Sequence, residues 1–186
     1  MKRITDIPKL ISYLIWRWWT IGQIEKFWAA KNYIDLINLC DEMISKGRPD
    51  HLAFYYRGLS NECLKLYDNS IRDFEQSERT FEAYKRKHLF KEYSSLIPIQ
   101  ISRVYRKMQN TEKAFEYADK SVQADNTDVK GLKYRASLKE DFTDNIGALE
   151  DLNEALRRRP SDKVILKMRD RLTYIVIQDK RETASR

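Results

Sequence analysis

The sequence predicts an all-α fold made of stacked helical hairpins, and two observations carry this prediction. First, a unit of 34 residues is present twice: when 95–128 is laid over 129–162, the small residue Ala114 meets Ala148. Second, apolar and small residues recur at helical spacing in both halves of each unit, with short polar breaks between the halves. A repeat of this length is typical of helix–turn–helix units, which bury their apolar faces by stacking on their neighbours.

These residues resemble the tetratricopeptide repeat (TPR) family, whose second helix opens on alanine and carries apolar and small residues over the following turns. The matching positions are Ala136, Ala148, Leu152, Ala155 and Pro160 in the last unit, and Tyr105, Ala114, Ala118 and Ser121 in the unit before it. The resemblance implies a right-handed superhelical array of about four hairpins, whose first helices line a concave groove. It also implies a non-catalytic scaffold or adaptor that binds other proteins in that groove.

The spacing of the second helices gives the domain organisation. Their opening residues are Leu36, Ser70, Ala114 and Ala148, in steps of 34, 44 and 34 residues. The expected elements are an N-terminal capping or membrane-interfacial helix (1–16), four hairpin units (17–50, 51–94, 95–128 and 129–162), and a C-terminal capping helix with a tail (163–186).

The longer middle step places ten additional residues in Phe81–Phe90, a stretch without Gly or Pro. We therefore expect the second helix of the second unit to continue for about two to three turns at 3.6 residues per turn, with a loop as the alternative. Ser94 and Ser95 are then expected to cap the next helix, with Pro98 in its first turn.

Composition and charge limit the classes of partner. Hydrophobic residues make up 42% of the 186 residues and charged residues 34%, which indicates a soluble, folded chain. The net charge of +7 favours acidic partners: an acidic protein segment, an anionic membrane surface or nucleic acid. Cys40 and Cys63 have no metal-ligand or redox spacing, so we expect reduced thiols and a cytoplasmic location, with membrane association as the alternative.

The sequence offers no motif that supports a reaction. It has no Gly-rich phosphate loop, no Cys/His metal spacing and no serine elbow, so we expect no enzyme activity, no catalytic residue, no cofactor and no metal. Neighbouring carboxylates such as Asp41-Glu42 and Glu140-Asp141 are interpreted as solvated helix surface.

The first helices, projected on the groove that the resemblance implies, give a candidate partner-binding site. Its residues are Tyr55, Leu59, Arg103, Arg106, Lys107, Lys130 and Lys133. Such a groove would be aromatic and apolar near the N-terminus and basic further on, which suits an acidic or mixed apolar–acidic segment. Arg103 and Arg106 can each hold a carboxylate through two hydrogen bonds. The alternative is that these are ordinary solvated charges.

A chaperone tail, which some TPR proteins bind, fits this predicted groove less well. Those proteins clamp the terminal carboxylate of a chaperone with Lys and Asn in their first helices. Ile21 and Glu25 stand at the leading places of that clamp here, which argues against a chaperone tail as the ligand.

The N-terminal stretch is rich in tryptophan and carries the alternative hypotheses. An apolar run of seven residues lies between Lys9 and Arg17 and ends at Trp16, and Arg17, Trp18 and Trp19 follow it; a membrane-spanning helix needs about 20. The stretch either covers the first repeat or anchors a peripheral, membrane-associated assembly factor at an anionic surface. Nucleic-acid binding ranks third, on the basic run Tyr84–His88.

Overall fold

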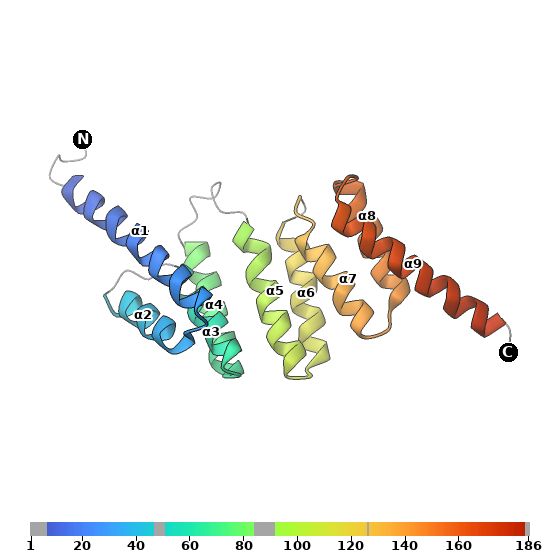
Figure 1. The fold of residues 1–186 in the computed structure, drawn as a ribbon, viewed down its shortest axis with the longest axis horizontal. Coiled ribbons are helices and arrows are strands. Elements are labelled where there is room, and N and C mark those ends of the chain that lie inside the picture. Colours follow the sequence, from blue (N-terminus) through green and yellow to red (C-terminus); the bar gives the residue numbers. More distant parts are fainter. Residues whose placement is uncertain (1–6, 47–50, 84–91, 126, 185–186) are drawn as a thin grey trace. The chain divides into compact units, whose positions relative to one another are not determined.

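The computed structural model describes residues 7–46, 51–83, 92–125 and 127–184, with side chains described within 18–46, 51–82, 94–125 and 127–183. All regular secondary structure in these ranges is helical (Figure 1). The helices are α1 (Ile7–Ala29), α2 (Tyr33–Ser45), α3 (His51–Cys63), α4 (Tyr67–Ala83), α5 (Glu92–Lys107), α6 (Thr111–Ala124), α7 (Lys130–Asp141), α8 (Asn145–Arg158) and α9 (Lys163–Ala184). The chain divides into two compact units, Met1–Phe81 and Glu82–Arg186.

Every hairpin turn has the same backbone geometry. The second residue after the first helix of each hairpin is left-handed, although none of these residues is glycine: φ is 54° at Lys31, 63° at Lys65, 59° at Gln109 and 64° at Thr143. These positions follow one another in steps of 34, 44 and 34 residues, as the sequence predicts for the second helices. In three of the four hairpins the next residue caps the second helix through its side chain: Asn32, Asn110 and Asp144.

The positions that define the repeat are fully buried. Leu36, Ser70, Ala114 and Ala148, which open the second helices, each have 0% of their surface exposed. The residues one turn later, Cys40, Phe74, Ala118 and Leu152, are also 0% exposed. Small residues here let the two helices of a hairpin approach closely, and the burial confirms the predicted repeat register.

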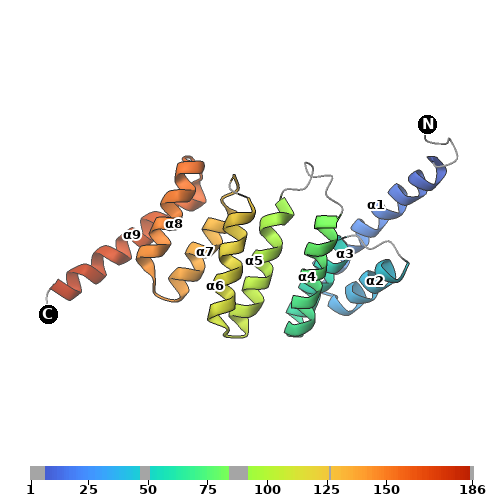
Figure 2. The ribbon, with the colours of Figure 1, turned by 180° about the vertical axis from the view of Figure 1, so that it is seen from behind.

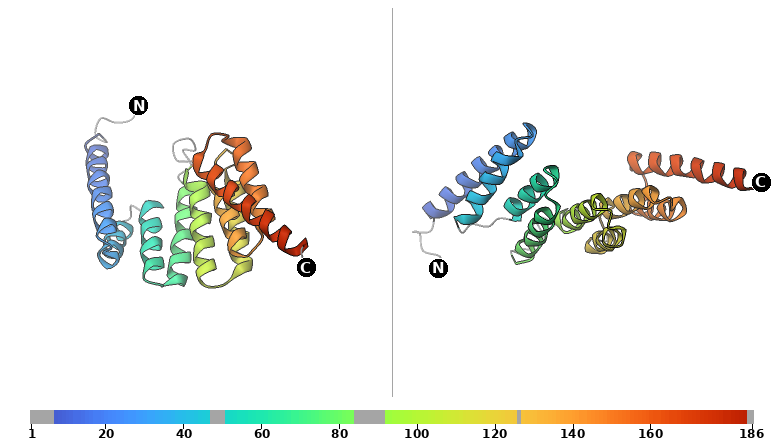
Figure 3. Two further views of the ribbon diagram at one scale, coloured as in Figure 1. Left: turned by 45° about the vertical axis from the view of Figure 1, so that its right-hand side comes forward. Right: turned by 90° about the horizontal axis from the view of Figure 1, so that it is seen from below.

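Each unit has its own hydrophobic core. In the first unit Ile24 of α1 packs with Leu36, Cys40 and Met43 of α2 and with Ala53 of α3. In the second unit the core comprises Val129, Leu132, Ala136, Ala148, Leu152, Ala155, Ile165 and Leu172. Figures 2 and 3 show the antiparallel pair α5 and α6 from behind and from two further directions.

Two local predictions about α5 are wrong, and one about α4 falls mostly outside the described residues. Helix α5 begins at Glu92, so Ser94 and Ser95 lie inside it and Pro98 lies beyond its first turn. The Ser95 hydroxyl instead donates to Asp128 at 3.1 Å. Helix α4 is described to Ala83; the rest of its predicted extension, 84–90, lies outside the described residues. Helix α1 is continuous across the expected boundary at residue 16.

Candidate partner-binding surface

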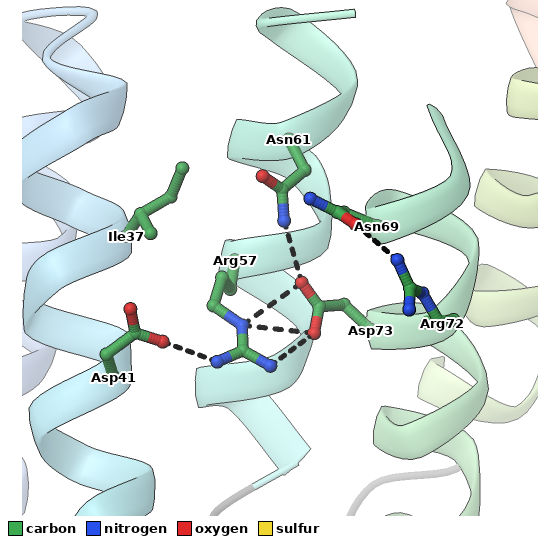
Figure 4. A pocket seen from close by; sticks show the side chains of 7 residues that line it. All are labelled: Ile37, Asp41, Arg57, Asn61, Asn69, Arg72 and Asp73. Atoms are coloured by element: carbon green, nitrogen blue, oxygen red, sulfur yellow. Dashed lines mark hydrogen bonds and ion pairs between the residues drawn. The ribbon is translucent and has the colours of Figure 1, made fainter. Parts of the chain in front are cut away.

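The first unit contains a polar pocket of about 380 Å³ (Figure 4). Its lining comes from α2, α3 and α4: Ile37, Asp41, Arg57, Asn61, Asn69, Arg72 and Asp73. Within this pocket Arg72 donates to the amide oxygen of Asn69 at 2.6 Å. The centre of the pocket is Arg57, whose guanidinium reaches two carboxylates on different helices.

We call Arg57, Asp41 and Asp73 the Arg57 clamp. Arg57 donates from Nη1 to Asp41 of α2, and from Nε and Nη2 to Asp73 of α4, at 3.0 and 2.5 Å to Oδ1. Asn61 adds a hydrogen bond to Asp73 Oδ2 at 2.8 Å. Burial lowers the pKa of Arg57, but the hydrogen bonds with Asp73 and Asp41 outweigh it and raise that pKa overall. Because these charged groups satisfy one another, the pocket is interpreted as a junction between hairpins and not as a ligand site.

The same arrangement occurs in the second unit, where we call Arg135, Asp119 and Asp151 the Arg135 clamp. Arg135 donates to Asp119 of α6 at 2.7 Å and to Asp151 of α8 at 2.6 and 2.9 Å. In both clamps the arginine lies 16 residues from each aspartate. The Asp151 hydrogen bonds are the main reason that the pKa of Arg135 is raised.

The two clamps differ in one partner. Asn61 donates its neutral amide to Asp73, whereas Lys139, at the equivalent place, lies 3.0 Å from Asp151 and 3.2 Å from the carbonyl of Gly147. The Arg135 clamp therefore has a second cation that the Arg57 clamp lacks. The clamps also correct the interpretation of Asp41 as simple solvated surface, because it joins α2 to α3.

In the second unit, three side-chain interactions join α5 to α7 or to the residues just before α7. Ser95 bonds Asp128 near the start of the helices, and the Tyr134 hydroxyl donates to Ser102 Oγ at 3.0 Å in the middle. Near the end, Arg106 pairs with Asp141 at 2.9 Å. The linked residues are 95 and 128, 102 and 134, and 106 and 141. Because the separation along the chain is nearly the same in all three pairs, α5 and α7 run parallel.

Along this pair of helices lie five of the predicted residues, Arg103, Arg106, Lys107, Lys130 and Lys133; together with Tyr134 we call them the α5–α7 surface. Burial raises the pKa of Tyr134, and its bond with Ser102 and the charges of Arg106 and Arg103 partly oppose this rise. Of the two arginines, Arg106 reaches α7 directly, through its ion pair with Asp141.

The cations of this surface differ in how far they are already neutralised. Arg103 donates to the neutral amide of Gln100 at 2.7 Å, and Lys130 lies 3.6 Å from Asp128. Arg106 is paired with Asp141, and Glu140 is paired with Arg171 of α9 at 2.6 Å. Glu140 and Asp141, predicted to be solvated surface, therefore link helices.

Among the cations of this surface, Lys133 has the charge that is most available to a partner. Its side chain is half-buried, and it forms no ion pair with any residue that the structure describes. A partner carboxylate could thus meet Lys133 without displacing an internal one. Lys107 is exposed at the end of α5.

The two predicted groove residues of the first unit have different surroundings. Tyr55 is 9% exposed and packs against Tyr56 and Phe74, with ring centroids 5.6 and 5.8 Å apart, and Leu59 is half-buried. Tyr55 thus stabilises the hairpin, whereas the predicted basic residues all lie in the second unit.

The predicted membrane-interface residues lie on α1. Trp18 is 79% exposed and Trp19 53% exposed, while the side chains of Trp16 and Arg17 lie outside the described ones. No helix within the described residues is both long enough and apolar enough to cross a membrane. Nor do those residues contain a group of three or more His, Cys, Asp or Glu side chains able to hold a metal ion.

Sequence reasoning missed Tyr134, Asp141 and the two clamps. The clamps have a readable signal, since an arginine with an aspartate 16 residues on either side occurs at Arg57 and again at Arg135. Asp141 has no comparable signal, because its partner Arg106 is identified only when α5 and α7 are side by side.

Comparison with known proteins assigns the fold. No family model matches the chain. Among solved structures, the first TPR domain of Spaghetti (RPAP3), bound to the HSP90 peptide SRMEEVD, has 13% identity and a TM-score of 0.53, over 69% of this chain and 96% of that one. MamA from Desulfovibrio magneticus RS-1 has 13% identity and a TM-score of 0.60, over 89% and 87%.

Cut9, in its APC/C complex with Hcn1, gives 13% identity and a TM-score of 0.63, over 82% of this chain but 29% of its own length. These likenesses, together with the buried repeat positions, show that the chain has an all-α, TPR-type repeat fold.

Proposed function

We propose that this chain, which has the fold of tetratricopeptide repeat proteins, is a non-catalytic scaffold that binds an acidic or mixed apolar–acidic protein segment on its α5–α7 surface. The observation that supports the proposal is the ion pair between Arg106 and Asp141 at 2.9 Å, which joins α5, the helix of Arg103 and Arg106, to α7, the helix of Lys133. Guanidinium groups bind carboxylates through paired hydrogen bonds, and lysine adds a point charge.

The likeness to solved structures supports a peptide as the partner. The Spaghetti (RPAP3) domain is bound to the peptide SRMEEVD, which contains two glutamates and an aspartate. Helical repeat arrays use extended surfaces of this kind for partners. Ile21 and Glu25 still occupy the leading places of the chaperone clamp, so we favour an acidic segment over a chaperone tail.

The test uses fluorescein-labelled acidic peptides, including SRMEEVD, with matched peptides in which Glu and Asp are replaced by Gln and Asn. We expect fluorescence polarisation to show tighter binding of the acidic forms. Lys133→Glu should weaken that binding about tenfold, or about 1.4 kcal/mol, and a further Arg106→Glu change should weaken it more.

Lys113→Glu is the matched control, because Lys113 is an exposed lysine of α6 whose ammonium lies over the Tyr105 ring. It makes the same charge change away from the α5–α7 surface and should leave binding unchanged. Lys133→Glu removes no internal ion pair, so its melting temperature should match that of the wild type. Equal affinity of the acidic and amide peptides, or of wild type and Lys133→Glu, would remove the α5–α7 surface from consideration.

A further inference from the structure

All four tryptophans of the chain lie in α1, and its outward side is aromatic. They are Trp16, Trp18, Trp19 and Trp28. Trp18 and Trp19 are 79% and 53% exposed, whereas Trp28 packs edge-on against Tyr33 and Tyr56 at 5.7 and 6.4 Å. A tryptophan buries about 150–250 Å² when covered, so two such rings in water are a large exposed apolar surface.

The hairpin partner of α1 is too short to cover it. Helix α1 has 23 residues and α2 has 13, which correspond to about 35 and 20 Å at 1.5 Å per residue. Among the α1 side chains that the structure describes, those of residues 18–29, the fully buried ones are Thr20 and Ile24. The remaining length of α1 extends beyond α2, as Figure 1 shows.

The geometry of the two exposed tryptophans favours a membrane surface over a partner helix or a groove on another protein. Trp18 and Trp19 are consecutive, so their directions differ by about 100° around the helix axis. A partner helix would instead meet residues three or four apart along a narrow seam. Tryptophan rings suit the headgroup region of a membrane, where one edge of the indole stays hydrated.

Charge complementarity indicates which membrane. Helix α1 contains Lys9, Arg17 and Lys26 against a single acidic residue, Glu25. The excess of basic residues on α1, beside its exposed tryptophans, favours an anionic lipid surface as the occupant.

We propose that α1 is a membrane-docking helix that lies parallel to an anionic lipid surface, with Trp18 and Trp19 in the headgroup region. The helix does not cross the bilayer, because no described helix has the length and apolar character to do so. Docking uses α1 in the first unit and is independent of the α5–α7 surface in the second.

The test uses the full chain and vesicles of phosphatidylcholine alone or with phosphatidylglycerol. Because all four tryptophans lie in α1, intrinsic fluorescence reports on this helix. We expect a blue shift and vesicle flotation with the anionic vesicles, and a partition coefficient at least about tenfold lower for the double variant Trp18→Ala/Trp19→Ala, since binding scales with buried apolar area.

Ile34→Ala is the control, since Ile34 is a 64% exposed apolar residue of α2. It should bind vesicles as the wild type does. Flotation of the double variant equal to wild type overturns the proposal, as does wild-type protein that stays unbound with anionic vesicles. Self-association that is lost in the double variant, without vesicle binding, would assign the tryptophans to a protein contact and also overturn it.

Discussion

The two clamps provide a matched experiment on how a buried carboxylate is stabilised. Arg57→Met and Arg135→Met remove the same guanidinium from the same kind of junction. Asp73 is then left with the neutral amide of Asn61, whereas Asp151 retains the ammonium of Lys139 at 3.0 Å. The Arg57→Met variant should therefore lose more stability than the Arg135→Met variant.

The magnitudes follow from the burial of the carboxylates. The side chain of Asp73 is 7% exposed and that of Asp151 is 6% exposed, so neither is well solvated. Leaving a buried charge without its partner costs about 3–5 kcal/mol, which we expect for Arg57→Met. With Lys139 still in place, Arg135→Met should cost about 1–3 kcal/mol, the loss of hydrogen bonds to a charged group.

The assay is urea unfolding followed by circular dichroism at 222 nm and by tryptophan fluorescence. The fluorescence reports on the first unit, which contains every tryptophan, and thus on Arg57→Met. Adding Asn61→Lys to the Arg57→Met variant should recover part of the loss, because it supplies the cation that the Arg135 clamp already has. Equal losses for the two arginine variants, with no recovery from Asn61→Lys, would refute this reasoning.

Two further predictions concern packing and thiol chemistry. Gly131→Ala should destabilise the chain by about 1–3 kcal/mol, because a Cβ there would lie 2.7 Å from the Ser121 carbonyl oxygen. Gly22→Ala should instead stabilise the chain by about 0.5–1 kcal/mol, because a Cβ there would have nothing within 4 Å. Thermal melts compare the two variants. Burial raises the pKa of Cys40 to about 12, and Cys63 is exposed. At pH 8 a thiol reagent should therefore modify one cysteine in the native chain and two in denaturant, and modification of both in the native chain would contradict the burial of Cys40.

The repeat could be predicted from the sequence because its determinants are local. The small residues that let two helices touch must recur at the hairpin period, so Ala114 and Ala148 identify the register without any coordinates. The steps of 34, 44 and 34 residues reappear in the left-handed turn residues. The left-handed turns themselves could not be read, because Lys31 and Thr143 share no residue type that favours this conformation.

The basic residues of the candidate site were also readable from the sequence as a pattern of charge on two neighbouring first helices. The sequence could not show which of these charges already have an ion-pair partner, because the partners lie on other helices. Arg106 meets Asp141 only because α5 and α7 lie parallel. Likewise, Lys139 of α7 pairs with Asp151 because α8 lies against it.

The sequence by itself determined the helical period, the hairpin boundaries near the turns and the excess of basic residues, since each of these depends on neighbours along the chain. Only the tertiary structure decided which charges become junctions and which remain available to a partner. The physical reason is that an ion pair forms where two helix faces meet, and 16 residues separate each clamp arginine from its aspartates.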